Sequence, residues 1–282
     1  MKKMPVKVNS KEVGLEIGLL LARFFLDSED LHFGYWPEGS KTGFLTFPEA
    51  QSRHSDLIFK NIPDNVDSIL DVGAGSGELA KKLSAKGFKV DCVSPSSFLS
   101  DSIESKLPAE SKLFRTTLEN LETENRYDLI LFSESFQYVK LQKGIEQCAR
   151  LLNRDGYLLI CDFFQLEKNE VSPLRGGKKL DRFFETIGKF PFHQVKDLDI
   201  TRETAPTIEI LDNFLTKFLK PTTTLSGKYL SSNYPLIYRM IKWKMHRRLD
   251  KIKRVYLSNK ITGESFIKHK SYRLFLYKTE SV

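Results

Sequence analysis

The feature that most constrains the fold is a short apolar run that leads through a glycine-rich turn into a helical pattern. Residues 68–86 read SILDVGAGSGELAKKLSAK. A strand followed by such a turn and a helix places backbone N–H groups and the positive end of a helix dipole around a ligand. Glycines let that ligand approach the main chain closely. We therefore expect a ligand site at Gly73, Gly75 and Gly77.

From about residue 66 onward, the chain alternates short apolar runs with helical patterns through five cycles. This alternation is typical of βαβ units and predicts an α/β fold with a mostly parallel sheet. The strands are predicted at 68–72, 88–93, 112–117, 127–133, 157–164, 193–201 and 271–279.

The pattern predicts four segments along the chain. Residues 1–62 are expected to form an N-terminal lid and helices, and residues 63–200 the ligand-binding core. Residues 201–270 are predicted to be a basic helical cap, which is too long for a plain connection between two strands. Residues 271–282 supply the last core strand. Together with the N-terminal helix, the cap would enclose a site.

Composition and cysteine usage indicate an ordinary folded protein of the cytoplasm. The 282 residues are 40% hydrophobic and 28% charged, which does not indicate disorder. The N-terminal apolar run is interrupted by Glu16 and Arg23, and no stretch reaches the roughly 18 apolar residues of a membrane span. Cys92, Cys148 and Cys161 lack CxxC spacing, which favours a reducing compartment and no metal site.

The spacing Asp-x-Gly-x-Gly-x-Gly, which begins at Asp71, resembles motif I of the class I S-adenosylmethionine-dependent methyltransferases. A dinucleotide-binding turn would need a third glycine where Glu78 stands, and a P-loop would need Gly-Lys-Ser/Thr. Residues 116–122, 125–139 and 149–163 resemble further segments of the same family. The resemblance implies a Rossmann-like, doubly wound sheet of seven strands, a methyltransferase activity and S-adenosylmethionine as cofactor.

Two segments upstream of the glycine turn resemble the small-molecule and lipid branch of that family. LTFPEAQSRHSDLIFKNI is similar to a helix of cyclopropane fatty acid synthases, mycolic acid methyltransferases and sterol or tocopherol methyltransferases. Gln51 takes the glutamine position of that helix, and His54 replaces a lysine. LHFGYWPEG is similar to an aromatic segment that folds over the methyl donor. The resemblance implies that Tyr35 and Trp36 face the sulfonium, whose positive charge suits an aromatic ring.

The resemblance also implies which residues hold the cofactor. Asp71 matches the acid near the methionine ammonium, and Thr117 stands where an acid often binds the adenine amine. Counting back from the pair Ser94–Pro95 places Cys92 where a carboxylate of the family usually binds the cofactor ribose. Asp91, one residue earlier, is the alternative. The expected cofactor-binding set is Tyr35, Gln51, Asp71, Gly73, Gly75, Gly77, Cys92, Val93, Thr117, Leu118 and Ser133.

Methyl transfer from a sulfonium is an in-line displacement, in which alignment and exclusion of water matter most. A base is needed only where the acceptor must lose a proton, and the candidates are His32, Glu134, Tyr138 and His193. In cyclopropane synthases the loop after the fourth strand carries a Glu-His pair that holds bicarbonate. Here the matching residues are Gln137 and Tyr138, which favours simple O-, N- or C-methylation.

Most of the positive charge lies near the C-terminus. Residues 201–282 contain 17 Lys or Arg against 6 Asp or Glu, whereas the whole chain carries a net charge of +8. Residues 236–257 combine a basic surface with an apolar helical stripe. Three interpretations stay open for this stretch: a solvated helix packed on the sheet, contact with an anionic membrane, or contact with nucleic acid.

The preferred hypothesis is a methyltransferase that acts on a small, apolar or lipid-like acceptor. An RNA methyltransferase that uses the basic C-terminal region is one alternative. Enzymes that methylate a base nitrogen usually carry Asn/Asp-Pro-Pro-Tyr/Phe after the fourth strand, whereas the sequence here, SESFQY, has no proline. Nucleic acid is therefore disfavoured as a partner. A second alternative is a non-catalytic binding protein with a methyltransferase-like fold.

Overall fold

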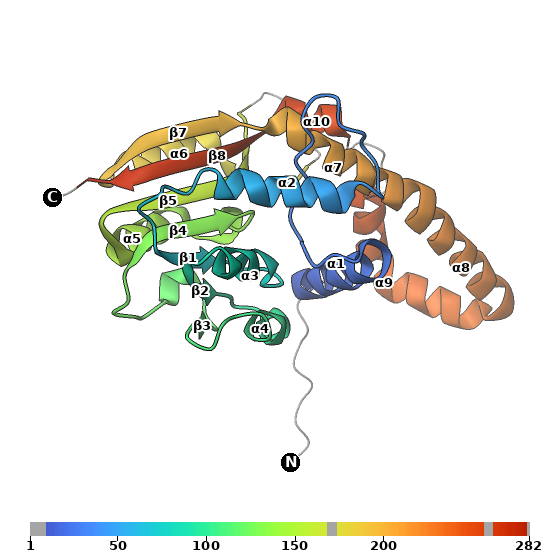
Figure 1. The fold of residues 1–282 in the computed structure, drawn as a ribbon. Helices are drawn as coiled ribbons and strands as arrows, with labels where there is room; N and C mark the ends of the chain where they lie inside the picture. The colour runs from blue at the N-terminus through green and yellow to red at the C-terminus, as the bar shows by residue number, and fades with distance from the viewer. Residues whose placement is uncertain (1–9, 168–173, 257–261, 281–282) are drawn as a thin grey trace, which may run out of the picture.

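The computed structural model describes residues 10–167, 174–256 and 262–280. A central sheet organises the molecule (Figure 1). Its strands are β1 (Ser68–Val72), β2 (Lys89–Val93), β3 (Leu113–Phe114), β4 (Tyr127–Ser133), β5 (Leu152–Gln165), β6 (Lys178–Lys179), β7 (Phe192–Asp199) and β8 (Lys270–Thr279). Seven of them lie in the order β3-β2-β1-β4-β5-β8-β7, and the two-residue β6 pairs with β5 off this path.

The sheet is mostly parallel, as the sequence predicts. β1 pairs in parallel with both β2 and β4, and β8 is antiparallel to both of its neighbours. Because the chain winds outward from β1 in both directions, the carboxyl ends of β1 and β4 border the crevice where such sheets bind ligands. The predicted Rossmann-like, doubly wound fold is confirmed.

Helices cover both faces of the sheet. The helices are α1 (Ser10–Leu26), α2 (Phe47–Phe59), α3 (Glu78–Ala85), α4 (Ser97–Glu104), α5 (Leu141–Leu151), α6 (Leu180–Ile187), α7 (Thr201–Phe214), α8 (Lys220–Asn233), α9 (Pro235–Tyr256) and α10 (Gly263–His269). The apolar faces of α2, α3 and α4 join one buried cluster, and those of α5 and α6 join the cluster on the opposite face. In α5, for example, the buried residues Ile145, Cys148 and Leu151 are three positions apart, so they lie on the helix face that packs against the sheet.

Most strand boundaries lie within two residues of those predicted, but β3 and β5 differ by more. β3 was expected over 112–117 but consists of two residues, because the Phe114 carbonyl accepts N–H groups from both Ser94 and Thr116 and the chain turns there. β5 begins at Leu152, five residues earlier than expected. Neither difference moves the carboxyl ends of the central strands.

Between β7 and β8 the chain is helical. α7 packs on α10 and continues through a π-helical turn, Leu215–Leu219, into α8. α8 and α9 lie side by side and extend beyond the sheet as a hairpin (Figure 1). None of the α8 side chains is buried. Among the residues that the structure describes, no helix is both long and apolar enough to cross a membrane.

The N-terminal half of α9 does not pack on the sheet. Its described side chains, from Pro235 to His246, are exposed except for the half-buried Tyr238. A solvated helix packed on the sheet, one of the three interpretations of this stretch, is therefore wrong for this half. The rest of the predicted stripe lies in the part of α9 whose side chains are not described, and residue 257 lies outside the described residues.

Candidate functional site

The glycine turn connects β1 to α3, and its three glycines have different structural roles. Gly73, Gly75 and Gly77 all adopt positive φ angles, of +78°, +56° and +83°. A Cβ at Gly73 would lie 2.5 Å from the Ser135 Cβ, and one at Gly77 would lie 2.9 Å from the Ile103 Cα. At Gly75 the nearest atom would be 4.0 Å away. Packing therefore explains two of the glycines, and only Gly75 leaves room beside the backbone.

Asp71 lies in β1, just before this turn, and has an unsatisfied carboxylate oxygen. The residue is 2% exposed, and its Oδ2 has no hydrogen-bond partner among the described residues. Burial raises the pKa of Asp71 to about 7. A buried acceptor without a partner is costly in a native protein, so a cationic ligand group at this position would satisfy it. The contact predicted between Asp71 and the cofactor ammonium group rests on this unsatisfied oxygen.

Both predicted ribose contacts lie near the end of β2, where the structure shows their surroundings. The Cys92 side chain is fully buried in the cluster beneath α3 and α4. The Asp91 carboxylate accepts hydrogen bonds from the Lys112 N–H at 2.8 Å and the Tyr127 hydroxyl at 2.8 Å. The first residue beyond the strand is Ser94, so a hydroxyl rather than a carboxylate or thiol stands at this edge. The ribose contact predicted for Cys92, with Asp91 as the alternative, stays a prediction.

The other predicted nucleoside contacts lie at the neighbouring strand ends. Thr117 directly precedes a short helical turn whose first residue, Leu118, is buried, and Val93 is buried in the same cluster. Ser133 is the last residue of β4, and its hydroxyl has no hydrogen-bond partner among the described residues. These positions border the same crevice as the glycine turn.

Glu134 follows β4 in an unusual backbone conformation. Its φ is +56°, which is rare for a residue other than glycine and often marks a functional position. The Glu134 Oε1 accepts hydrogen bonds from the Tyr272 hydroxyl at 2.7 Å and from the Phe33 N–H at 2.5 Å. Burial raises the pKa of Glu134, although the nearby His32 opposes this effect. The structure thus brings two of the predicted bases, Glu134 and His32, into one site.

The segment before α2 covers the glycine turn through polar contacts. The Ser76 hydroxyl donates to the Glu29 carbonyl at 2.6 Å, and Lys82 contacts Asp30 at 2.6 Å. His32 also contacts Asp30, at 3.3 Å; burial lowers the pKa of His32, but Asp30 outweighs burial and the net shift is upward. The Gln51 side-chain amide donates to the carbonyls of Asp30 and His32. Gln51 therefore holds the lid segment in place.

His54, the residue that replaces a lysine, lies deeper in the protein. Its ring stacks on His32 at a centroid distance of 4.6 Å, and its Nε2 lies 3.0 Å from the Tyr272 hydroxyl. Burial lowers the pKa of His54 well below the ordinary value, so the ring is neutral. Tyr272 therefore connects His54 to Glu134. The sequence analysis missed Tyr272, because its only signal was one position in an alternating last strand.

The remaining predicted residues divide between the core and the surface. Trp36 is buried, stacks on Phe47 of α2 and lies 3.4 Å from the Thr207 hydroxyl of α7, so it packs between these helices. The neighbouring Tyr35 is partly exposed. Tyr138 is 68% exposed, and partial burial together with the charges of Asp162 and Glu134 raises its pKa. His193 lies on β7, the strand at the far edge of the sheet.

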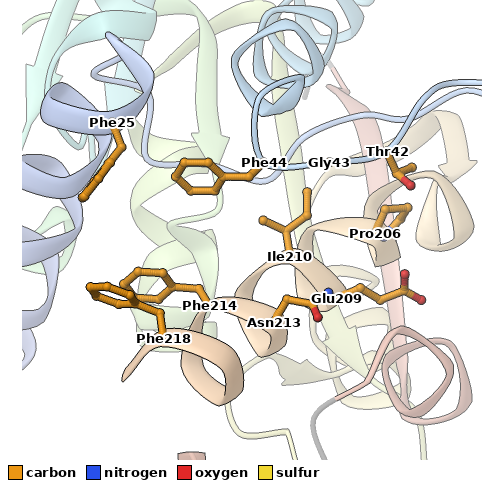
Figure 2. Close-up of a pocket in the computed structure, with 10 residues that line it drawn as sticks. All are labelled: Phe25, Thr42, Gly43, Phe44, Pro206, Glu209, Ile210, Asn213, Phe214 and Phe218. Carbon is orange, nitrogen blue, oxygen red and sulfur yellow. The ribbon is translucent and has the colours of Figure 1, made fainter. Parts of the chain in front are cut away.

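An apolar pocket of about 360 Å³ opens between the end of α1 and α7 (Figure 2). Figure 2 shows four aromatic rings beside this space, from three segments that are distant in sequence. Glu209 and Asn213 add polar groups on the α7 side. The lining residues are Phe25, Thr42, Gly43, Phe44, Pro206, Glu209, Ile210, Asn213, Phe214 and Phe218. Pockets of this size with few polar groups suit small organic molecules.

A family comparison matches residues 46–196 to a methyltransferase domain. An uncharacterized methyltransferase of Mycobacterium tuberculosis is 30% identical over 97 residues, which are 34% of this chain and 40% of the relative. The chain thus matches less than half the length of that relative. An uncharacterized methyltransferase of Bacillus cereus is 22% identical over 154 residues, 54% of this chain and 68% of the relative.

Solved structures share the fold over nearly the whole chain. The crystal structure of the cyclase SpnF superposes with a TM-score of 0.68 at 16% identity, covering 99% of both chains. A cyclopropane synthase from Mycobacterium tuberculosis has a TM-score of 0.63 at 13% identity, covering 96% of this chain and 95% of the other. A geranyl diphosphate C-methyltransferase from Streptomyces coelicolor A3(2) has a TM-score of 0.63 at 12% identity, covering 98% and 100%. At these identities the likeness concerns the fold.

Proposed function

The chain belongs to the methyltransferase domain family, which matches more than half of its length, and from this premise we propose that it methylates a small acceptor with an apolar body, using S-adenosylmethionine. One observation carries the proposal. The unsatisfied Asp71 carboxylate lies beneath a turn in which only Gly75 has free space beside its backbone. A buried acid next to accessible main chain suits the charged amino acid end of this cofactor.

The chain's own residues would bind and orient the cofactor. Asp71 would pair with the ammonium group, and the backbone beside Gly75 would receive the methionine portion. Ser94 and Thr117 follow β2 and β3, where their hydroxyls would hydrogen-bond the nucleoside. When bound, the cofactor supplies an electrophilic methyl group on a sulfonium. Gln51 would contribute indirectly, because it holds the lid segment that excludes water.

Glu134 is the best placed of the predicted bases. It lies at the carboxyl end of β4, and its raised pKa suits a group that accepts a proton near neutral pH. Tyr272 and Phe33 both donate to Oε1, so neither contact uses Oε2. Tyr272 and the neutral His54 would orient the carboxylate and accommodate its change of charge. We assign His32 a positioning role, because Asp30 favours its protonated form.

The apolar acceptor is inferred from the pocket in Figure 2. Aromatic rings from three segments of the chain favour an apolar body, and Glu209 and Asn213 would contact a polar group of the acceptor. The membrane contact predicted for residues 236–257 stays a proposal alongside it.

A matched glycine pair tests the cofactor site. Gly75 and Gly87 both have positive φ, of +56° and +96°, and no atom closer than 4.0 Å to an added Cβ, so alanine strains the backbone at Gly87 at least as much as at Gly75. Only Gly75 lies at the site. We expect calorimetry to show that Gly75→Ala weakens binding of S-adenosylmethionine at least tenfold, whereas Gly87→Ala leaves it unchanged. Wild-type protein that fails to bind at millimolar cofactor would refute the enzyme and favour a non-catalytic binding protein.

A further inference from the structure

The hairpin formed by α8 and α9 exposes an unusual apolar stripe. Leu236, Met240 and Trp243 are 78%, 59% and 78% exposed. Their spacing of four and three residues puts them on one face of α9. Arg239 and Lys244 border this face on its two sides, because they are displaced from it by about a quarter turn in opposite directions. A helix with an apolar stripe between two basic edges is suited to the boundary between lipid headgroups and acyl chains.

The charge of the hairpin selects among the surfaces that such a stripe could contact. Between Asp212 and Asp250 the sequence contains no acidic residue and eight Lys or Arg. A second copy of the chain would bring like charges together at this surface, whereas an anionic surface would neutralise them. Arg239, Lys242 and His246 also line a shallow hollow beside Trp243. A negatively charged headgroup fits such a hollow.

A continuous helical run, formed by α7, the π-helical turn and α8, connects the pocket to the hairpin that carries the stripe. Phe214 and Phe218 line the pocket at the end of α7, and the chain continues from them directly into α8. Phe218 lines the pocket and is 53% exposed. Phe24 and Leu45, which are 82% and 86% exposed, each adjoin a lining residue in the sequence, Phe25 and Phe44. We call Phe24, Leu45 and Phe218 the apolar rim. Exposed apolar side chains of this size next to a pocket indicate an interaction surface.

From these observations we infer that the α8–α9 hairpin and the apolar rim dock on an anionic membrane surface. Trp243 and its two stripe neighbours would insert at the headgroup boundary, and the basic side chains would contact anionic lipids. The pocket would then open toward the bilayer, so that an apolar acceptor reaches it without crossing water. This last step rests on the proposed function, whereas the docking itself does not.

Vesicle flotation with the full chain tests the docking. We expect binding to vesicles of phosphatidylcholine mixed with phosphatidylserine, little binding to phosphatidylcholine alone, and weaker binding at high salt. Lys242→Gln with Lys244→Gln should weaken binding about 25-fold, since each near-surface lysine contributes about fivefold. Trp243→Ala should weaken it at least about tenfold. The matched control neutralises Lys143 and Lys189, which are exposed on the helix α5 and just beyond the helix α6, far from the hairpin.

Each outcome decides between docking and its competitors. Equal binding of the wild type and both hairpin variants to anionic vesicles overturns the inference, as does a control variant that binds as poorly as they do. Binding to RNA that depends on the two lysines but not on Trp243, without vesicle binding, would assign the hairpin to nucleic acid instead. A dimer that dissociates in Trp243→Ala, again without vesicle binding, would assign it to a second copy. Calorimetry with S-adenosylmethionine on every variant separates the two proposals. A variant that loses vesicle binding but still binds the cofactor concerns docking alone, and protein that binds vesicles but not the cofactor contradicts only the proposed function.

Discussion

Replacing Asp71 by Asn should stabilise the protein without ligand and weaken its binding of cofactor. The carboxylate is buried and unsatisfied, and its pKa lies at about 7 instead of the ordinary 3.8. This difference corresponds to about 4 kcal/mol between the two protonation states. Asparagine has nearly the same shape and does not ionise, but its amide is also incompletely satisfied. The expected gain in unfolding free energy at pH 8 is therefore smaller, about 1 to 3 kcal/mol.

The direction of the Asp71 pKa shift determines how the stability of the wild type changes with pH. The pKa of Asp71 is higher in the folded state than in the unfolded state, so the unfolded state releases this proton first. The wild type therefore loses stability as pH rises from about 4 to 7, and the loss is complete above pH 7. The difference between Asp71→Asn and wild type should grow over the same window and then stay constant. Urea denaturation at several pH values measures it.

Cofactor binding should respond in the opposite direction. The ionised Asp71 carboxylate pairs with the ammonium group, so Asp71→Asn should weaken the affinity on the order of 100-fold, because it leaves a buried charge unpaired. Wild-type affinity should fall about tenfold for each pH unit below 7 and fall again above about 8, where an α-amino group loses its proton. Calorimetry between pH 5.5 and 9 records this profile.

Asp64→Asn is the matched control, since Asp64 is exposed and lies outside the site. It should change neither stability nor affinity measurably. Unchanged cofactor affinity in Asp71→Asn would show that Asp71 is not the counter-charge. A variant less stable than wild type at pH 8 would show that burial does not strain this carboxylate, and the reasoning from its unsatisfied oxygen would fail.

Three further predictions test other parts of the site. Ile210→Trp should fill the pocket and reduce binding of an apolar dye at least tenfold, with unchanged cofactor affinity by calorimetry. Tyr272→Phe removes the hydroxyl that donates to Glu134. It should lower the unfolding free energy by about 1 to 3 kcal/mol in urea denaturation. It should also raise the pKa of Glu134 and so move the acidic limb of the pH–activity profile to higher pH. Lys270 is buried, and burial lowers its pKa to about 8, so the stability of the wild type should rise between pH 8 and 10.5. Lys270→Met should abolish this rise and increase the unfolding free energy at pH 7 by about 1 to 3 kcal/mol, as thermal unfolding would show.

The sequence by itself determined the fold class and the place of the cofactor turn. β1 and β4 have the predicted bounds, 68–72 and 127–133, because a buried parallel strand is a mostly apolar run, which Asp71 interrupts in β1 and Asp128 in β4. The glycine turn is recognisable because its positive φ angles are a local requirement that glycine meets. Signals of this kind depend only on neighbouring residues, so they can be read along the chain.

Only the tertiary structure decided which side chains meet. Sequence alternation could not show that Cys92 lies in the core and that Ser94 follows the strand, because residues two apart in a strand face the same side and only packing decides which of them is covered. Glu134 and Tyr272 are 138 residues apart, and their hydrogen bond exists because β8 lies next to β5 in the sheet.

The pocket and the hairpin were also decided by the tertiary structure. In the sequence, the four aromatic residues that line the pocket resemble ordinary core residues: Phe25, Phe44, Phe214 and Phe218. The apolar residues of α9 likewise resemble a helix face that packs on a sheet. The identity of a hydrophobic residue does not show which atoms, if any, will cover its side chain in the fold. Burial depends on contacts between distant segments, and the fold left these particular side chains facing a cavity or solvent.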